Sequence, residues 1–490
     1  MAESTRAHTR QDRTLPRIIQ GGMGVAISGW ELANAVARRG QMGVVSGTIL
    51  EVVMARRLQL GDPGGHVRRA LHNFPFRSAA ERIIDTYYEP ADGKGPKQLK
   101  NVRTFTVVPG LPLQELTVAA NFVEVFLAKE GHNGPVGINY LRKIEMPIPF
   151  SIYGALLAGV DYIIVGAGNP KELPHLISEL AEHRAVRLPL RVQGLTSKDA
   201  DVEMRFDPSD INEGRLPPIS RPRFLAIVAS NDLAAALAGM PEAPDGFVIE
   251  KPSAGGHNAP PRGPRRIDEL GQPVYDKKDE VDLAELRTLG LPFWLAGSFG
   301  TPEGLRRALR EGAAGVQVGT AFAFCEESGL VADIKRTITK QVADGTVEVL
   351  SDWRASPTGF PFRIVQVDGT LSDEAVYDDR SRVCDLGALR VPYQTENGSI
   401  GYRCPAEPLR AYIEIKGGRA ANTEQRLCLC NGLLATAGLP QFRAKSGYEE
   451  PALVTAGSDF SGVKELMQRR TPGESFYTAD EVIDYLMSNA

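Results

Sequence analysis

Short apolar runs recur along the first two thirds of the chain, and most are followed by a segment with helical spacing. The runs are continuous and rich in Val and Ile instead of alternating with polar residues, which is typical of parallel strands covered on both faces. In the segment 29–40, Leu32 and Val36 lie on one helical face before Gly40. The eight runs that predict strands are 17–23, 43–48, 134–141, 161–170, 223–230, 246–252, 292–298 and 315–322.

Eight strand–helix units in succession predict an α/β fold, a (β/α)8 TIM barrel over residues 16–330. A doubly wound open sheet is the structural alternative. Two stretches interrupt the pattern, at about 50–130 and at 188–222. They are interpreted as insertions, the first with helical segments and the second as a polar hairpin.

Beyond residue 330 the alternation fades. Residues 331–490 are therefore predicted to be a C-terminal α+β extension, with strands at 361–369 and 411–418 and a last helix at 478–489. Residues 1–15 are polar and predict a disordered N-terminal lead.

Composition excludes several classes of protein. The chain has 490 residues, of which 42% are apolar and 24% charged, and its formal net charge is −4. This balance gives no basic surface for nucleic acid, and no apolar run approaches the roughly 20 residues that a membrane helix needs. The N-terminus lacks the apolar segment of a secretory signal, and five cysteines do not suggest a disulfide framework. We expect a cytoplasmic protein that acts on a small molecule, and a homo-oligomer is compatible with this composition.

Two predicted strands near the end of the barrel are followed by glycine-rich turns. Gly297, Ser298 and Gly300 follow the seventh strand, and Gly319 and Thr320 follow the eighth. Glycine allows close backbone approach, and barrels commonly hold a phosphate after these two strands. The pair of turns predicts a phosphate site, although two tight turns without a ligand would use the same residues.

His257 follows Gly255 and Gly256 where the sixth apolar run ends in a proline-rich loop. At the carboxyl end of a barrel strand this histidine would face the ligand cavity. Histidine titrates near neutral pH and can both take and return a proton. Gly-Gly-His by itself is also compatible with an exposed turn.

Six motifs follow one another at barrel spacing: IIQGGMG (18–24), GINY (137–140), VGAGNP (165–170), SAGGHNAPPRG (253–263), LAGSFGTPEG (295–304) and GVQVGTAF (315–322). With these motifs the chain resembles the nitronate monooxygenase family, also called 2-nitropropane dioxygenases, which are FMN-binding TIM barrels. It is also similar to the related flavin-dependent enoyl-acyl carrier protein reductases. The insertion at 50–130 and the C-terminal extension depart from the compact members of the family, which leaves the substrate open.

The resemblance implies a role for particular residues. His257 would be the catalytic acid–base, and Asn139 would hydrogen-bond the polar edge of the flavin ring. The cofactor-binding residues that it implies are Gln20, Gly21, Gly22, Met23, Asn139, Gly166, Gly168, Gly256, Gly297, Ser298, Gly300, Gly319 and Thr320. The first four would lie along the ring and the last five around the phosphate.

Two flavin chemistries fit this set of residues. As a monooxygenase, the protein would oxidise alkyl nitronates with O2 and use no nicotinamide. As an enoyl reductase of acyl carrier protein or CoA substrates, it would take electrons from NAD(P)H. A barrel that binds a phosphorylated ligand without redox chemistry is the third hypothesis. The loop 258–280 could act as a lid whose arginines hold an anionic substrate, or it could be a solvated charged loop.

The remaining candidate chemistry lies in the extension. Cys384, Cys404, Cys428 and Cys430 could form a four-thiolate site for zinc or for an iron–sulfur cluster. Their spacing is unlike the usual C-x-x-C pairs, and buried cysteine often serves only as a small apolar residue. Cys325 is expected to be a core residue.

Overall fold

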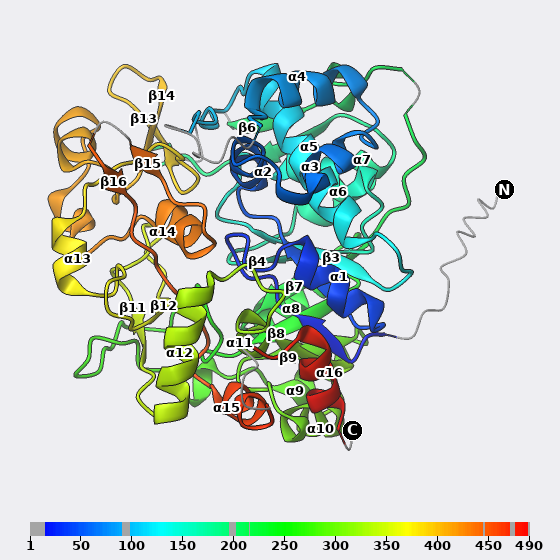
Figure 1. The fold of residues 1–490 in the computed structure, drawn as a ribbon, viewed down its shortest axis with the longest axis vertical. Coiled ribbons are helices and arrows are strands. Elements are labelled where there is room, and N and C mark those ends of the chain that lie inside the picture. Colours follow the sequence, from blue (N-terminus) through cyan, green and yellow to red (C-terminus); the bar gives the residue numbers. More distant parts are fainter. Residues whose placement is uncertain are drawn as a thin grey trace.

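The structure is a computed structural model, and it describes residues 15–90, 99–195, 202–214, 216–443, 446–470 and 476–488. The predicted disordered lead lies outside the described residues except for Leu15. Figure 1 shows a barrel with a second lobe, in yellow and orange, on one side of it.

Eight parallel strands form the barrel, and all eight predicted runs are among them. Their order is β1-β10-β9-β8-β7-β4-β3-β2. The ring closes where Ile19 of β1 bridges Met42, just before β2. The bounds are β1 Ile18–Gln20, β2 Gly43–Ser46, β3 Val136–Leu141, β4 Tyr162–Gly166, β7 Arg223–Val228, β8 Gly246–Glu250, β9 Phe293–Ala296 and β10 Gly315–Val318. The prediction of a TIM barrel is confirmed.

Helices cover the outside of the barrel because their apolar faces pack against strands that are buried on both sides. Leu32, Val36 and Ala37 of the first helix are fully buried, as their spacing predicts. The helices are α1 Trp30–Arg38, α2 Leu50–Gln59, α5 Leu111–Ala128, α6 Ile148–Leu157, α7 Leu173–Ala181, α8 Asn231–Ala238, α9 Leu283–Thr288, α10 Pro302–Arg310 and α11 Thr320–Ala323. Among the described residues, α5 alone is long and apolar enough to cross a membrane, and 78% of it is buried inside the protein.

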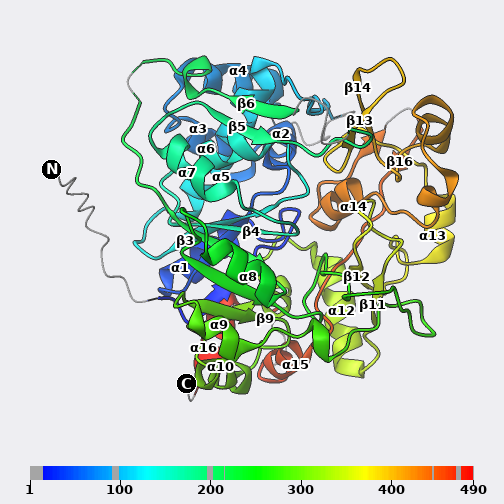
Figure 2. The same cartoon turned by 180° about the vertical axis from the view of Figure 1, so that it is seen from behind.

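The two insertions differ from their predicted extents. Helix α5 packs beside β2 and β3 as a helix of the barrel, so the first insertion ends before it. It contains η1 Pro63–Gly65, α3 His66–Leu71 and α4 Arg77–Tyr87. The second holds the predicted hairpin, because β5 Val186–Pro189 and β6 Glu203–Phe206 pair antiparallel. This hairpin packs beside α6 and α7 (Figure 2).

The C-terminal extension contains short hairpins and helices. The predicted strand at 361–369 is present, but residues 411–415 of the other form a π-helical turn instead of a strand. The elements are α12 Ala332–Asp344, β11 Val349–Asp352, β12 Phe362–Val365, α13 Glu374–Asp379, β13 Val391–Gln394, β14 Ile400–Arg403, η4 Ala411–Ile415, η5 Ala420–Thr423, α14 Leu429–Thr436, β15 Phe442–Arg443, β16 Tyr448–Glu449, α15 Ser461–Gln468 and α16 Ala479–Met487.

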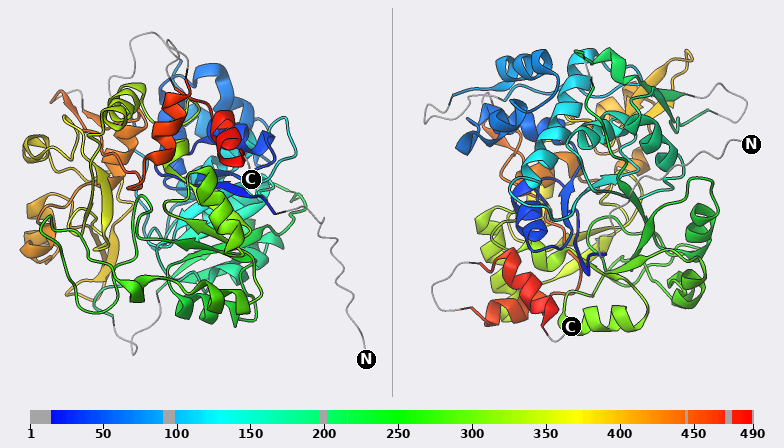
Figure 3. Two further views of the ribbon diagram at one scale, coloured as in Figure 1. Left: turned by 90° about the horizontal axis from the view of Figure 1, so that it is seen from below. Right: turned by 90° about the vertical axis from the view of Figure 1, so that its right-hand side faces the viewer.

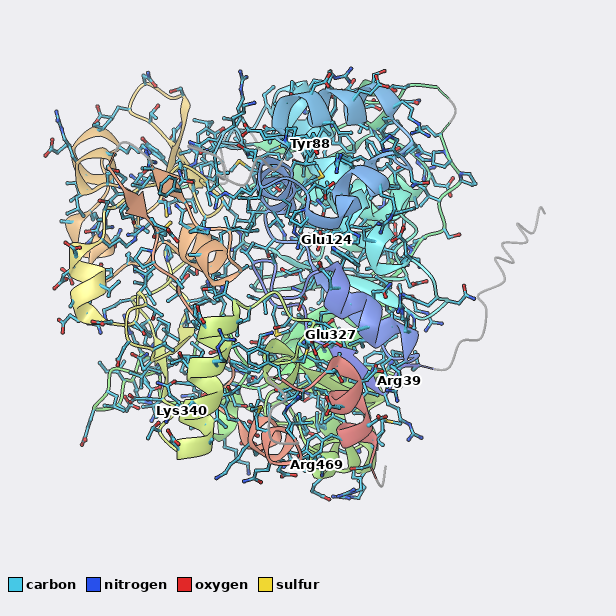
Figure 4. The ribbon with its side chains drawn as sticks, in the orientation of Figure 1. Arg39, Tyr88, Glu124, Glu327, Lys340 and Arg469 are labelled. Atoms are coloured by element: carbon cyan, nitrogen blue, oxygen red, sulfur yellow. The ribbon has the colours of Figure 1, made fainter. Side chains whose placement is uncertain are left out.

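The last two helices return from the extension to the barrel, as both views of Figure 3 show in red. The predicted final helix, α16, packs against α1 and α10. Arg39 at the end of α1 pairs with Asp484 of α16 at 2.5 Å, and Figure 4 labels this arginine beside α16. The Ala479 N–H donates to Glu327 at 2.8 Å. The extension is therefore anchored on the barrel at its far end as well as at residue 330.

Candidate active site

A cavity of about 250 Å3 opens at the carboxyl ends of the barrel strands. Ligand sites of TIM barrels lie at this end. Residues that follow β1, β4, β8, β9 and β10 line it, and so do segments of the extension around 388–389, 429–433 and 455–463. The wall of the cavity is thus built jointly by the two parts of the chain.

Most of the predicted cofactor-binding residues line this cavity. They are Gly21, Gly22, Met23, Asn139, Gly166, Gly256, Gly297, Ser298, Gly300, Gly319 and Thr320. Six strand ends therefore bring together residues that lie up to 300 positions apart in the sequence, as the barrel topology requires.

Two predicted residues do not line the cavity. Gln20 is fully buried, and its amide is used within the fold: Nε2 donates to Ser28 Oγ at 2.8 Å, and Oε1 accepts from the Val44 N–H at 2.9 Å. Gln20 therefore joins β1 to β2 instead of lying along a flavin. Gly168 lies beyond the cavity, where an added Cβ would come within 2.9 Å of the Arg142 side chain.

The turn after β9, where a phosphate is predicted to bind, has backbone angles that allow a ligand to approach the main chain closely. Gly297 has φ +91° and Ser298 has φ +58°. Residues other than glycine rarely adopt this left-handed region. At the neighbouring turn, Thr320 Oγ1 accepts a hydrogen bond from the Gly457 N–H at 3.0 Å. The extension thus reaches the predicted phosphate site directly.

Two amide side chains of barrel strands line the cavity. Asn139 of β3 is 8% exposed. Gln317 of β10 also lines the cavity, and its Oε1 is buried without a partner. Buried polar atoms are normally hydrogen-bonded, so the Gln317 oxygen indicates a polar ligand. Sequence reasoning missed Gln317, although it lies within the GVQVGTAF motif.

The residues present fit a flavin mononucleotide. Its ring carries hydrogen-bonding groups that Asn139 and Gln317 can satisfy. An added Cβ would meet no atom within 4 Å at Gly256, and at Gly319 only Met23 atoms, the nearer at 3.6 Å. These glycines keep open the space that the cofactor would occupy, with the turns at 297–300 and 319–320 on the phosphate side.

His257 lies in the cavity wall on the loop after β8, as predicted. The loop pairs with the extension like a short strand, because His257 forms an antiparallel bridge with Phe362 of β12. The Asn258 N–H donates to the Pro361 carbonyl, and the Arg363 N–H donates to the Gly256 carbonyl, both at 3.0 Å. The extension therefore fixes the backbone of the histidine.

The ring of His257 is also held by the extension. Its Nε2 shares a hydrogen bond of 2.6 Å with Ser356 Oγ, which in turn shares one of 2.8 Å with Thr358 Oγ1. Ser356 is fully buried. Nδ1 of His257 has no hydrogen-bond partner among the described residues, which leaves that nitrogen for a ligand.

The surroundings of His257 favour its neutral form. Burial, and then the nearby Lys143 ammonium, lower the pKa of His257 to about 3. Burial, and then Arg191, lower the pKa of Lys143 to about 7. At neutral pH His257 is therefore an unprotonated imidazole.

Glu250 is a second titratable group in the cavity, and sequence reasoning did not assign it a role. Burial raises the pKa of Glu250 to about 7, against the effect of a hydrogen bond from the Asn258 side chain. It ends β8, seven positions before His257, and its place at a strand end was the available signal. A carboxyl group with this pKa can hold or release a proton near neutrality.

The arginines of the loop 258–280 do not line the cavity. Arg266 pairs with Asp276 of the same loop at 2.5 Å, and the Arg265 guanidinium lies 4.5 Å from the Trp353 ring centroid. These contacts favour the solvated charged loop over an anion-binding lid.

The cysteines take two different places. Cys325 is fully buried beside α11, as expected of a core residue. Cys384, Cys404, Cys428 and Cys430 all line one small cavity of about 10 Å3 in the extension. No group of three or more His, Cys, Asp or Glu side chains in the described part of the chain is placed to hold a metal ion. Zinc or an iron–sulfur cluster at the four cysteines therefore stays a prediction.

Comparisons with known proteins agree with the geometry. Residues 223–355, which include β7 to β10 and His257, match the family model "Nitronate monooxygenase". The predicted relationship is confirmed over this stretch. A comparison with curated proteins finds no match.

Three solved structures align along nearly the whole chain. FabK from Thermotoga maritima has 15% identity and a TM-score of 0.46, covering 96% of this chain and 92% of its own. The nitroalkane oxidase from Streptomyces ansochromogenes has 15% identity and a TM-score of 0.44, covering 97% and 96%. The enoyl reductase domain of MlnA from Bacillus amyloliquefaciens has 14% identity and a TM-score of 0.48, covering 97% and 95%.

Proposed function

We propose that this protein is an FMN-dependent oxidoreductase of the nitronate monooxygenase type, which oxidises alkyl nitronates with O2. One observation carries the proposal: within the stretch that matches the family, His257 faces the same cavity as the unpartnered Gln317 oxygen and the glycine-rich ends of β9 and β10. An unpartnered amide oxygen favours a ligand with polar groups, and the glycine turns favour a phosphate.

Different parts of the chain would hold the cofactor. Gly21, Gly22 and Met23 would lie along the ring, with Asn139 and Gln317 at its polar edge. The turns at 297–300 and 319–320 would receive the phosphate. When bound, FMN supplies the two-electron chemistry and the reaction with O2.

His257 would accept the α-proton of the substrate. A nitronate already lacks its α-proton, whereas a neutral nitroalkane must lose it. Neutral His257 can accept that proton at Nδ1 in the tautomer whose Nε2–H donates to Ser356 Oγ. Glu250, in the same cavity, can return a proton to solvent or product, because its pKa of about 7 allows both forms.

We also propose that the protein is cytoplasmic. All five cysteines are free, as is usual in a reducing compartment. The two other hypotheses are an NAD(P)H-dependent enoyl reductase and a non-redox barrel. One experiment distinguishes both from the monooxygenase.

The test is an anaerobic absorbance titration of the purified protein with propyl-2-nitronate, NADH and NADPH, each added separately. We expect bound flavin whose absorbance bands bleach with the nitronate alone. Bleaching only by a reduced nicotinamide would replace the proposal with the reductase. A colourless protein that releases no FMN on heating would replace it with the non-redox barrel.

A further inference from the structure

The cavity has an apolar wall on the side of the extension. The end of β3 with the loop after it, β12, residues 388–389 and α14 contribute to this wall. In Figures 1 and 2, α14 lies on the side of the extension that faces the barrel. The side chains of the wall belong to one hydrophobic cluster or pack against it. The apolar wall consists of the lining residues Leu141, Ile144, Phe362, Ala388, Leu389, Leu429, Cys430 and Leu433.

The apolar wall begins at the imidazole of His257. The Phe362 ring is nearly perpendicular to it, with 4.9 Å between the ring centroids and 69° between the planes. The backbones of the two residues are also joined by an antiparallel bridge. A substrate whose α-carbon lies at Nδ1 of His257 would therefore have the apolar wall beside it.

The apolar wall lies across the cavity from the predicted phosphate site. Leu141 ends β3, and Ile144 is in the loop after it, whereas Gly297 and Ser298 follow β9. In the order β1-β10-β9-β8-β7-β4-β3-β2, β3 and β9 are four places apart in a ring of eight strands. Their ends therefore stand on opposite sides of the rim. A cofactor phosphate at the β9 turn leaves the apolar wall to the flavin ring or to the substrate.

The apolar wall offers no charge to a ligand. Among the described residues that line the cavity there is no lysine or arginine, and the acidic ones are Glu250 and Asp459. Asp459 accepts hydrogen bonds from the Ser461 N–H at 3.0 Å and from the Ser461 hydroxyl at 2.6 Å. Lys143, in the loop after β3, does not line the cavity, and its Nζ lies 2.7 Å from the Phe360 ring centroid. Burying a charge without a partner is costly, so the part of a substrate that lies on this wall is uncharged.

We propose that the apolar wall binds the hydrocarbon chain of the substrate, so that the protein selects alkyl nitronates and nitroalkanes with long unbranched chains. The inference rests on the proposed function, whose substrate class it narrows. The α-carbon would lie at His257, and the chain would extend past Phe362 toward Leu389 and Leu433. Each methylene group that moves from water to this wall strengthens binding by about three- to fourfold, until the chain reaches the end of the wall. Six of the eight wall residues belong to the extension, which would thus determine the chain length.

The first test is a chain-length series with the unaltered, flavin-loaded protein. The substrates are nitroethane, 1-nitrobutane and 1-nitrohexane, each also as its nitronate, and the readout is kcat/KM from O2 consumption. We expect kcat/KM to rise on the order of 100-fold from the two-carbon to the six-carbon compound. A flat or falling series overturns the inference and leaves the proposed function standing. Turnover of none of these compounds overturns the proposed function, and binding then decides the role of the wall.

Binding of unreactive ligands tests the apolar wall without turnover, again with the unaltered chain, so it does not depend on how a variant folds. Butanamide, hexanamide and octanamide are uncharged, and their planar amide groups resemble a nitro group in size. Isothermal titration calorimetry should give a Kd that falls about tenfold with every two methylene groups. The heat-capacity change of binding should become more negative along the series. A Kd that does not depend on chain length overturns the inference.

A substitution in the apolar wall distinguishes a substrate site from a cofactor site. Leu433→Asn keeps the size of the side chain but makes it polar. The ratio of kcat/KM for 1-nitrohexane to kcat/KM for nitroethane should therefore fall about tenfold. Leu309→Asn is the matched control and should keep the ratio, because Leu309 is partly buried on α10 and does not line the cavity. If Leu433→Asn instead keeps the ratio and loses FMN, the wall holds the apolar edge of the flavin ring, and the inference is wrong.

Discussion

The barrel and the extension differ in what holds their elements together. The barrel strands form one parallel sheet that a bridge between Ile19 and Met42 closes, and their apolar residues are buried on both faces. In the extension, β11–β12, β13–β14 and β15–β16 are isolated pairs of two to four residues per strand. Such hairpins are marginal alone, so their positions depend on contacts with distant residues.

The two regions nevertheless share one site. The barrel supplies His257 and the glycine turns, and the extension supplies the hydroxyl that holds the histidine and part of the cavity wall. The comparison indicates that the barrel carries the chemistry and the extension positions it. Four substitutions test that division of roles.

The largest effect is expected in the barrel. His257→Asn removes the group that can accept a proton, so turnover of a neutral nitroalkane should slow by at least ~100-fold, while FMN stays bound. Steady-state kinetics with a nitroalkane and with its preformed nitronate measure the effect, and the nitronate should be affected less. His72→Asn, on an exposed helix end, is the control. Unchanged turnover of the neutral substrate would remove His257 from the mechanism.

The second largest effect is expected where helix α15 of the extension packs against the barrel. A Cβ on Gly462 of α15 would lie 2.2 Å from the Gly300 carbonyl oxygen, which is backbone and cannot rotate away. Gly462→Ala should therefore cost about 1–3 kcal/mol of stability and reduce FMN content. Thermal unfolding followed by circular dichroism and the ratio of flavin to protein absorbance measure both. Gly239→Ala is the control, because its Cβ would approach no atom closer than 3.5 Å. Equal stability and flavin content in the two variants would show that the contact between α15 and the barrel can adjust to the added methyl group.

The difference between the regions also explains what the sequence could predict. The barrel strands and most cavity residues were predictable because buried parallel strands leave continuous apolar runs, and their ends share one rim. The hydrogen bonds of Gln20 were not predictable, because a motif does not say whether an amide turns inward, as Gln20 does to Ser28, or outward to a ligand. Ser356, which contacts His257, and Thr455, which accepts from the Gly256 N–H at 2.9 Å, were missed because only long-range pairing brings them to this loop. The segment TAGSDFSG at 455–462, rich in small residues, was the signal for that approach.

The third effect tests whether the extension positions the histidine. Ser356→Ala leaves His257 Nε2 without its partner, and loss of one hydrogen bond of this kind corresponds to about tenfold in kcat for a neutral nitroalkane. KM and FMN content should hold, and Ser356→Thr, which keeps the hydroxyl, should recover part of the rate. Ser351→Ala is the matched control, because that hydroxyl is buried in the same extension without a partner. If both alanine variants lose the same activity, Ser356 acts through stability and not through His257.

The smallest effect comes from the charge beside the histidine. Burial is the larger cause of the lowered His257 pKa and Lys143 the smaller, so Lys143→Met should raise that pKa only part of the way from about 3 toward 6.5. A base acts only when unprotonated, so its activity is lost as the pH falls through its pKa. In the unaltered protein the titration of His257 should not lower the rate with a neutral nitroalkane above about pH 4, and any acid limb near pH 7 belongs to Glu250. In Lys143→Met the acid limb should move to higher pH, and Lys171→Met, on the surface, should not move it. The measurement is kcat/KM between about pH 4 and 8, where histidine titration is resolved. If Lys143→Met and the unaltered protein have the same pH profile down to pH 4, the repulsion between Lys143 and protonated His257 is contradicted as a cause of the low His257 pKa.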